Sequence, residues 1–210
     1  MEKLIICFSI FYLGSFLGCI IEEIWCLITR QKFEIRKSMV YEPLIPIYGF
    51  SALLIVLIAD KVGYNLLKVF FIGAITASIV EYFSSYFQEK IFHTKSWDYS
   101  KFFLNLHGRI NLLYSIGFGL CSVAFIKNLK KLALFIVYNC NINLLFTIAT
   151  VLLVIFMFDM IISFLATYRQ KKRREKGKPK TKLDKFLDKR YPDERLDRIY
   201  SNSVYIKDKK

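Results

Sequence analysis

Residues 4–29 read LIICFSIFYLGSFLGCIIEEIWCLIT, an apolar run whose only charged residues are the adjacent carboxylates Glu22 and Glu23. A helix of about 20 residues crosses the hydrocarbon core of a bilayer, so this run is long enough to span a membrane. It exceeds the apolar core of a signal peptide, and no A-x-A-like cleavage site follows it. We therefore expect an uncleaved membrane span here.

Further apolar runs follow, and 55% of the chain is hydrophobic, above the roughly 45–50% of a soluble domain. The runs predict an all-α, polytopic membrane protein with five transmembrane helices within residues 1–168, at about 4–29, 43–59, 67–89, 108–126 and 147–168. Residues 130–146 are short and contain the polar sequence NCNIN. Three alternatives stay open for these residues: an interfacial segment, a re-entrant segment or a sixth span.

The C-terminal residues 169–210 form a basic tail, with 17 Lys and Arg against 7 Asp and Glu. Apolar residues recur at helical spacing on either side of Pro192: Leu183, Phe186, Leu187, Leu196, Ile199 and Tyr200. We expect short amphipathic helices in a cytoplasmic tail that contacts anionic lipids. A specific RNA or protein partner is the alternative, and we favour lipid over nucleic acid.

The basic residues of the short loops predict the orientation, because cytoplasmic loops carry an excess of Lys and Arg. Loop 30–42 and loop 90–109 hold four each, loop 60–66 with its edge holds two, and KNLKK at 127–131 holds three. With five spans, the richer loops and the tail share one side. This predicts a multi-pass protein of the cell membrane with its N-terminus outside and its C-terminus in the cytoplasm. A sixth span would oppose the charge bias.

Charged side chains inside spans usually face a bundle interior or a watery cavity. Four acids meet this description: Glu22, Glu23, Glu81 and Asp159. With five spans, Glu22, Glu81 and Asp159 lie about seven to nine residues from the inner ends of their helices, so all three are expected in the inner half of the membrane. Adjacent helical residues point about 100° apart, so only one of Glu22 and Glu23 can face a shared site. Basic groups of the inner loops approach the same zone: Arg36, His107 and Arg109. We expect a polar site near the inner leaflet, or a static ion-pair network that fixes helix packing.

Other chemistries have little support in the sequence. The five cysteines form no CxxC pair and have no histidine at ligand spacing, so we expect no metal and no cofactor. The chain has no phosphate-binding G-x-x-x-x-G-K-[ST] loop, no H-x-x-E-H and no G-x-S-x-G motif. No residue is therefore assigned a catalytic role.

Four segments occur in the order GCIIEEIW, KFEIRKSMVYEPLIPIYGF, EYFSSYFQEKIF and SWDYSKFFLNLHGRINL. In this series the chain resembles the bacterial family of ABC-transporter type IV permeases, over about residues 14–126. The matching positions are Glu22, Arg36, Pro43, Pro46, Tyr48, Gly49, Glu81, Trp97, Asp98, Tyr99, Asn105, Gly108 and Arg109. The family pattern has glycine where this chain has Lys37 and Glu42, so the first inner loop is expected to differ in conformation.

The resemblance also nominates the residues of the site. We take as binding candidates Glu22, Arg36, Tyr48, Glu81, Trp97, Asp98, Asn105 and Arg109. It favours Glu22 over Glu23 as the acid that faces the site. The WDYS sequence at 97–100 has two interpretations, an anchor at the membrane interface or, through Asp98 and Arg109, a gate at the inner mouth of the site.

The resemblance implies a transport component, in which a separate ATPase subunit supplies the hydrolysis that this chain lacks. So small a permease also implies a homodimer. Two alternatives stay open. One is an intramembrane enzyme acting on a lipid or polyprenyl substrate, with a carboxylate as general base and Arg36 or Arg109 holding a phosphate. The other is a non-catalytic membrane scaffold or partner protein.

Overall fold

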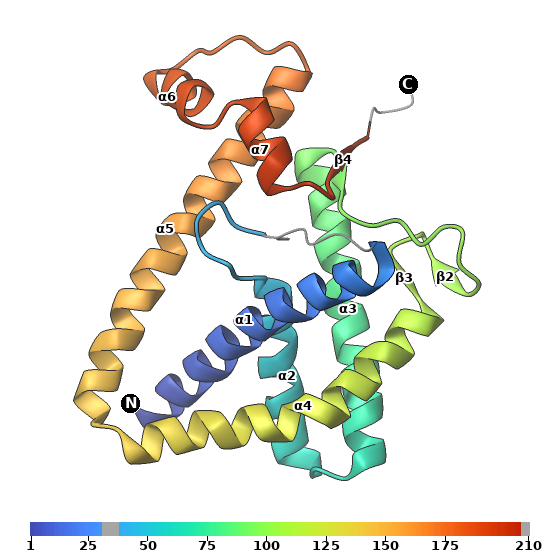
Figure 1. Ribbon diagram of the computed structural model, residues 1–210, viewed down its shortest axis with the longest axis vertical. Helices are drawn as coiled ribbons and strands as arrows, with labels where there is room; N and C mark the ends of the chain where they lie inside the picture. The colour runs from blue at the N-terminus through green and yellow to red at the C-terminus, as the bar shows by residue number, and fades with distance from the viewer. Residues whose placement is uncertain (31–37, 207–210) are drawn as a thin grey trace.

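The computed structural model describes residues 1–30 and 38–206 (Figure 1). Arg36, one of the expected site residues, lies outside this part of the chain. The helices are α1 Glu2–Arg30, α2 Pro46–Val62, α3 Leu66–Phe92, α4 Leu112–Asn139, α5 Ile142–Arg174, α6 Lys182–Arg190 and α7 Asp193–Ile199. The strands have two residues each: β1 Thr94–Lys95, β2 Asn105–Leu106, β3 Ile110–Asn111 and β4 Val204–Tyr205. The predicted all-α class is confirmed.

Within residues 1–30 and 38–206, three helices are long and apolar enough to cross a membrane: α1 over Glu2–Ile28, α3 over Leu66–Phe92 and α5 over Ile142–Arg174. The chain is thus a membrane protein by the length and composition of its helices. The other two predicted spans correspond to α2, which has 17 residues, and α4. Five crossings therefore stay a prediction.

The expected boundary after residue 126 is wrong. Helix α4 continues through the basic KNLKK sequence to Asn139, because Ile126, Leu129, Ala133 and Val137 form a buried stripe at helical spacing. The polar NCNIN sequence is the turn into α5, where the Asn141 side chain accepts hydrogen bonds from the first backbone N–H groups of that helix. In the described part of the chain, residues 130–146 form no separate helix.

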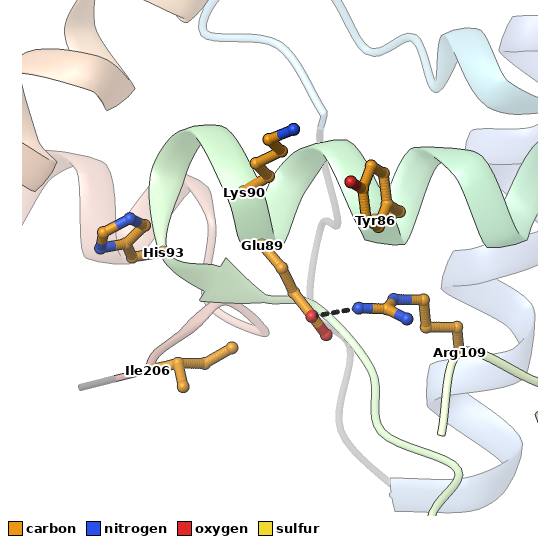
Figure 2. Close-up of a pocket in the computed structure, with 6 residues that line it drawn as sticks. All are labelled: Tyr86, Glu89, Lys90, His93, Arg109 and Ile206. Carbon is orange, nitrogen blue, oxygen red and sulfur yellow. Dashed lines mark hydrogen bonds and ion pairs between the residues drawn. The ribbon is translucent and has the colours of Figure 1, made fainter. Parts of the chain in front are cut away.

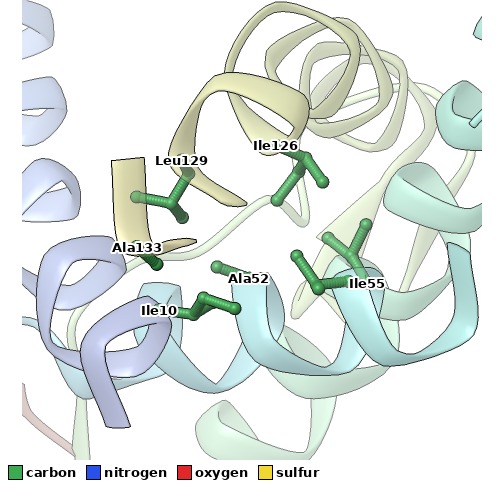
Figure 3. Packing of buried hydrophobic residues seen from close by; sticks show 7 residues of the cluster. Ile10, Ala52, Ile55, Ile126, Leu129 and Ala133 are labelled. Atoms are coloured by element: carbon green, nitrogen blue, oxygen red, sulfur yellow. The ribbon is translucent and has the colours of Figure 1, made fainter. Parts of the chain in front are cut away.

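The helices α1, α2 and α4 meet around one hydrophobic cluster (Figure 3). Ile10 of α1, Ala52 and Ile55 of α2, and Leu129 and Ala133 of α4 are buried there. Small side chains let these helices approach each other, as is common for helices in membranes.

The helices alternate in direction, so that their turns gather at two opposite ends (Figure 1). The N-terminus, the α2–α3 turn and the α4–α5 turn lie at the lower end of the view. The ends of α3 and α5, the tail helices α6 and α7, and the C-terminal strand β4 lie at the upper end. There β4 pairs antiparallel with β1, which ties the tail to the segment that follows α3.

Candidate functional site

Two of the expected intramembrane acids lie in one cluster with two tyrosines. The Tyr48 hydroxyl of α2 donates to Glu22 Oε1 of α1 at 2.8 Å. The Tyr99 hydroxyl, from the loop between α3 and α4, donates to Glu81 Oε1 of α3 at 3.2 Å. The two pairs lie close enough for a charge on either carboxylate to act on the other carboxylate and on both tyrosines. We call Glu22, Tyr48, Glu81 and Tyr99 the acid–tyrosine cluster.

Glycines on α1 and α2 allow this cluster to form. A Cβ atom at Gly18 would lie 2.4 Å from Cγ of Tyr48, well inside contact distance. A Cβ atom at Gly49 would lie 2.1 Å from Oγ of Ser15 and 2.4 Å from the Phe11 carbonyl oxygen. The two backbones therefore approach closely only because both positions lack a side chain. The close approach carries the Tyr48 hydroxyl to Glu22, one helical turn beyond Gly18.

Glu81 is the most buried acid of the cluster, with 8% of its surface exposed. Its Oε1 accepts from Tyr99, but its Oε2 is buried and has no hydrogen-bond partner in residues 1–30 and 38–206. A buried carboxylate oxygen without a donor is costly, so it either takes up a proton or accepts a donor or cation from a bound molecule. The site thus has one open acceptor position.

Tyr99 is held so that it acts as a neutral donor. Its ring stacks on Tyr114 of α4, with centroids 4.6 Å apart, and Trp25 of α1 packs edge-on against Tyr114 at 6.1 Å. Burial raises the pKa of the Tyr99 hydroxyl above its ordinary value, and the neighbouring Glu81 carboxylate raises it further. Aromatic rings therefore form one wall of the cluster, and Tyr99 keeps its proton at neutral pH.

Among the described residues, Arg109 makes no contact with any member of the acid–tyrosine cluster. Its Nη2 pairs with Glu89 Oε2 near the end of α3 at 2.6 Å (Figure 2). Its guanidinium also lies over the rings of Tyr82 and Tyr86, 5.4 and 5.5 Å from their centroids. The expectation that Arg109 shares a site with Glu22 and Glu81 therefore finds no contact to support it here. Residue spacing could not show which carboxylate a loop arginine would reach.

Three further binding candidates shape the loop that carries Tyr99. Trp97 Nε1 donates to the Arg109 carbonyl at 3.0 Å, and Asn105 Oδ1 accepts from the Gly108 N–H at 2.9 Å. Asp98 Oδ1 accepts from the Ser100 N–H at 2.9 Å, and this backbone hydrogen bond lowers the pKa of Asp98. These contacts position the loop, and through it Tyr99, rather than face the cluster.

The same loop also requires a glycine. Gly108 has a φ of +68°, and a Cβ atom there would lie 2.8 Å from Asp98 Oδ1. The Gly108 carbonyl accepts from the Tyr99 N–H at 2.7 Å. Glycine is therefore needed both for the backbone conformation and for the space beside Asp98.

Asp159 lies apart from the other acids. It is 1% exposed, and its Oδ2 accepts from the backbone N–H groups of Tyr41 and Glu42, at 3.0 and 2.7 Å. Its Oδ1 accepts from Ser163 Oγ at 3.1 Å. Asp159 therefore joins the chain before α2 to α5. This junction is separate from the acid–tyrosine cluster, and a site shared by Glu22 and Glu81 in the inner half of the membrane stays a prediction.

Sequence reasoning missed Tyr99 as the donor to Glu81 and Tyr114 as the ring behind it. Tyr99 matched the family pattern but was not taken as a binding candidate. This match and its position in the WDYS sequence were the available signals. Its direction depends on the fold of residues 93–111, which no spacing rule predicts.

Comparison with known proteins adds one finding to this geometry. A search of curated proteins found no match, and a search of solved structures found none. The sequence profile of the family described as "Putative ABC-transporter type IV" matches residues 9–164. This range includes most of α1, all of α2 to α4, most of α5 and every residue of the acid–tyrosine cluster. Because it covers well over half of the 210 residues, the chain belongs to the ABC-transporter type IV family.

Proposed function

We propose that this protein is the permease-like, membrane-spanning component of a transport system, and that the acid–tyrosine cluster binds the transported species. That species is a cation, a proton or a polar solute that presents a hydrogen-bond donor. The observation that carries the proposal is the open acceptor of Glu81, whose Oε2 is buried without a hydrogen-bond partner among the described residues. A protein that only packed its helices would gain by filling or removing this position.

The setting of the cluster supports a transport role. Glu22 lies on α1 and Glu81 on α3, both of which are long and apolar enough to cross a membrane. Tyr48 is contributed by α2 and Tyr99 by the loop before α4. A relative movement of these elements would change the hydrogen bonds at both carboxylates. Binding at the cluster can therefore be coupled to a change in helix arrangement.

The family supports the partners that we propose. An ABC-type transporter requires ATP hydrolysis, and this chain has no phosphate-binding loop, so a separate ATPase subunit supplies it. We further propose a homodimer in the cell membrane, with the N-terminus outside and the C-terminus in the cytoplasm. The tail and the segment after α3 lie at the same end of the molecule (Figure 1), and the Lys and Arg residues that the sequence has in both support this orientation. The cluster then lies nearer the inner leaflet.

A scaffold role is the second candidate, and the pairing of Arg109 with Glu89 favours it, because that contact joins two elements without facing the acid–tyrosine cluster. The same contact bears on one form of the intramembrane-enzyme alternative. That alternative needs Arg36 or Arg109 to hold a phosphate beside a carboxylate base, and Arg109 pairs with Glu89 instead of an acid of the cluster. Arg36 lies outside the described residues, so its part in that alternative stays a hypothesis.

The proposal is tested by isolating the full chain from its native membranes with the ATPase that accompanies it. The complex is reconstituted in vesicles, and ATP hydrolysis is measured for wild type, Glu22→Gln and Glu81→Gln. Each change keeps the side-chain size and removes a charge. We expect both variants to remain bound to the ATPase. The part of the ATP hydrolysis rate that depends on this chain should fall more than tenfold in each.

Glu194→Gln, an equal change in the tail helix α7, is the matched control and should leave the rate unchanged. Unaltered hydrolysis in both cluster variants would contradict the transport proposal. Loss of protein abundance in both, with no effect of the control, would instead favour the scaffold role.

A further inference from the structure

One face of α3 changes from apolar to charged along its length. The residues of this face recur every three or four positions: Phe71, Ile75, Ile79, Tyr82, Tyr86 and Lys90. The first three are apolar, the two tyrosines are amphipathic, and the last is cationic. This order of apolar, amphipathic and cationic side chains along one face matches the change from membrane interior to membrane interface.

The apolar part of this face borders a groove of about 540 Å³. It is also lined by Leu112 and Ile116 of α4 and by Leu106 of β2 and Ile110 of β3. The α3 residues that line it run from Phe70 to Phe83, which is about 20 Å of helix. The groove therefore has the length and the lining that suit a hydrocarbon chain.

A separate pocket of about 350 Å³ lies one helical turn further along the same helix (Figure 2). Tyr86, Glu89, Lys90 and His93 line it from the end of α3, and Arg109 and Ile206 complete it. Arg109 links the two hollows, because its guanidinium lies over Tyr82 of the groove and over Tyr86 of the pocket. The groove and the pocket thus follow one another along α3.

The cationic groups of the pocket exceed what its carboxylate, Glu89, can neutralise. Glu89 pairs with Arg109 and, at 3.3 Å, with Lys95. Lys90 lies over the Tyr86 ring, 5.6 Å from its centroid, and has no carboxylate partner in the described part of the chain. Arg109 Nε is buried without a hydrogen-bond partner among the same residues. The excess positive charge and the open donors are complementary to an anionic oxygen group.

We propose that the groove and the pocket together bind one anionic phospholipid. An acyl chain lies along α3 and α4 in the groove, and the headgroup phosphate lies in the pocket beside Lys90 and Arg109. A membrane-embedded helix of another chain would fill the groove and leave the pocket without an anion. A free phosphate would fill the pocket and leave the groove empty. Only an amphipathic anion satisfies both parts.

The site is tested by native mass spectrometry of the full chain in detergent, titrated with dioleoyl phosphatidylglycerol or dioleoyl phosphatidylcholine. We expect wild type to bind the anionic lipid more tightly. Lys90→Gln should weaken phosphatidylglycerol binding about fivefold, because this is the affinity that one basic residue near an anionic membrane surface contributes. It should leave phosphatidylcholine binding unchanged. Lys61→Gln, at the other end of the molecule, is the matched control and should change neither.

Two further measurements separate the parts of the site. Ile79→Trp, at an exposed position of the groove, should weaken both long-chain lipids. Dihexanoyl phosphatidylglycerol and inorganic phosphate should bind at least tenfold more weakly than the long-chain lipid. Equal binding of the two headgroups by wild type, equal effects of Lys90→Gln and Lys61→Gln, or equally tight binding of inorganic phosphate would each overturn the proposal. None of these measurements depends on transport activity.

Discussion

At the scale of single residues, the side chains of Glu22 and Glu23 point in different directions and have different partners, as expected for adjacent positions of a helix. Glu22 accepts from the Tyr48 hydroxyl at 2.8 Å, whereas Glu23 Oε1 lies 3.7 Å from Cys19 Sγ on its own helix. The sequence predicted that only one of them would face a site, because their directions differ by about 100°. It could not predict the partner of Glu22. That contact depends on Gly18, whose missing side chain leaves the space that Tyr48 fills.

Gly18→Ala should therefore break the contact between Tyr48 and Glu22. The added Cβ would lie 2.4 Å from Tyr48 Cγ, so the ring or the helix must move. We expect a loss of about 1–3 kcal/mol in the free energy of unfolding, typical of overpacking in a close interface. Unfolding in a mixed-detergent titration, followed by tryptophan fluorescence, measures this loss.

Gly117→Ala is the matched control, because a Cβ at that position of α4 meets nothing within 4 Å. This change should be neutral or should stabilise the helix by up to about 1 kcal/mol, since alanine has the higher helix propensity. If Gly18→Ala were as stable as Gly117→Ala, the close approach of α1 and α2 at Tyr48 would be wrong.

At the scale of elements, the two tail helices pack against the end of α5. Leu187 of α6 and Leu196 of α7 are buried in one cluster with Ala166 of α5. Arg169, itself 3% exposed, donates from Nε and Nη2 to both carboxylate oxygens of Asp188, each at 2.8 Å. Part of the apolar face expected to lie on lipid is therefore occupied by α5. Leu183 and Phe186 remain exposed, and lipid contact through them stays a prediction.

The docking of α6 should depend on pH through Asp188. Hydrogen bonding to the Arg169 guanidinium lowers the pKa of Asp188 in the folded protein. The stability from this contact is thus present above the unfolded pKa of about 4 and is lost as the pH falls through the lowered folded value. We expect α6 to separate from α5 on acidification below about pH 4. Pulsed electron paramagnetic resonance between spin labels at Lys172 and Lys185, in a chain without its native cysteines, measures that distance.

Asp188→Asn should weaken the docking by about 1–2 kcal/mol at neutral pH and reduce its dependence on pH, because the amide carries no charge to lose. Glu194→Gln in α7 should retain the wild-type pH profile. A tail distance that stayed constant to pH 3 in wild type would rule out a role for Asp188 in docking.

The sequence predicted the existence of these elements better than their ends or their contacts. The apolar runs located all five long helices, and the spacing around Pro192 located α6 and α7. The end of α4 was wrong because the lysines at 127–131 were read as a loop, whereas the buried stripe through Leu129 and Ala133 continues the helix. The partner of Arg109 was missed for a related reason. Local patterns predict helices, but the fold of the loop decides which carboxylate its arginine meets.

At the scale of the whole molecule, the turns and termini divide between two ends (Figure 1). The α2–α3 turn around Asn65 and the α4–α5 turn at Cys140 lie with the N-terminus, whereas Ser203, next to β4, lies with the tail helices. The pairing of β1 with β4 also brings the chain after α3 to the tail end. This arrangement agrees with an odd number of crossings.

Cysteine accessibility in intact cells tests the proposed orientation. Single cysteines at Asn65 and at the native Cys140 should react with an impermeant maleimide, and cysteines at Ser100 and Ser203 should react only after the cells are opened. The opposite pattern would invert the protein and place the acid–tyrosine cluster nearer the outer leaflet. Equal reaction at Asn65 and Ser100 would contradict the crossing of α3.

The most direct measurement of the central claim is the accessibility of the site beside Glu81 during ATP hydrolysis. Ser85→Cys, one helical turn from Glu81 on α3 and 4% exposed in the wild type, keeps every residue of the acid–tyrosine cluster. In a chain without its native cysteines, this variant is treated with a cationic methanethiosulfonate reagent in vesicles that contain the ATPase partner. Ala133→Cys, in the apolar cluster and 0% exposed, is the buried control. If the acid–tyrosine cluster lies on a transport path, the cysteine at 85 reacts at least tenfold faster when ATP is added, and the cysteine at 133 stays unreactive. A rate at 85 that is as low as that at 133, with and without ATP, would contradict a transport site at the acid–tyrosine cluster.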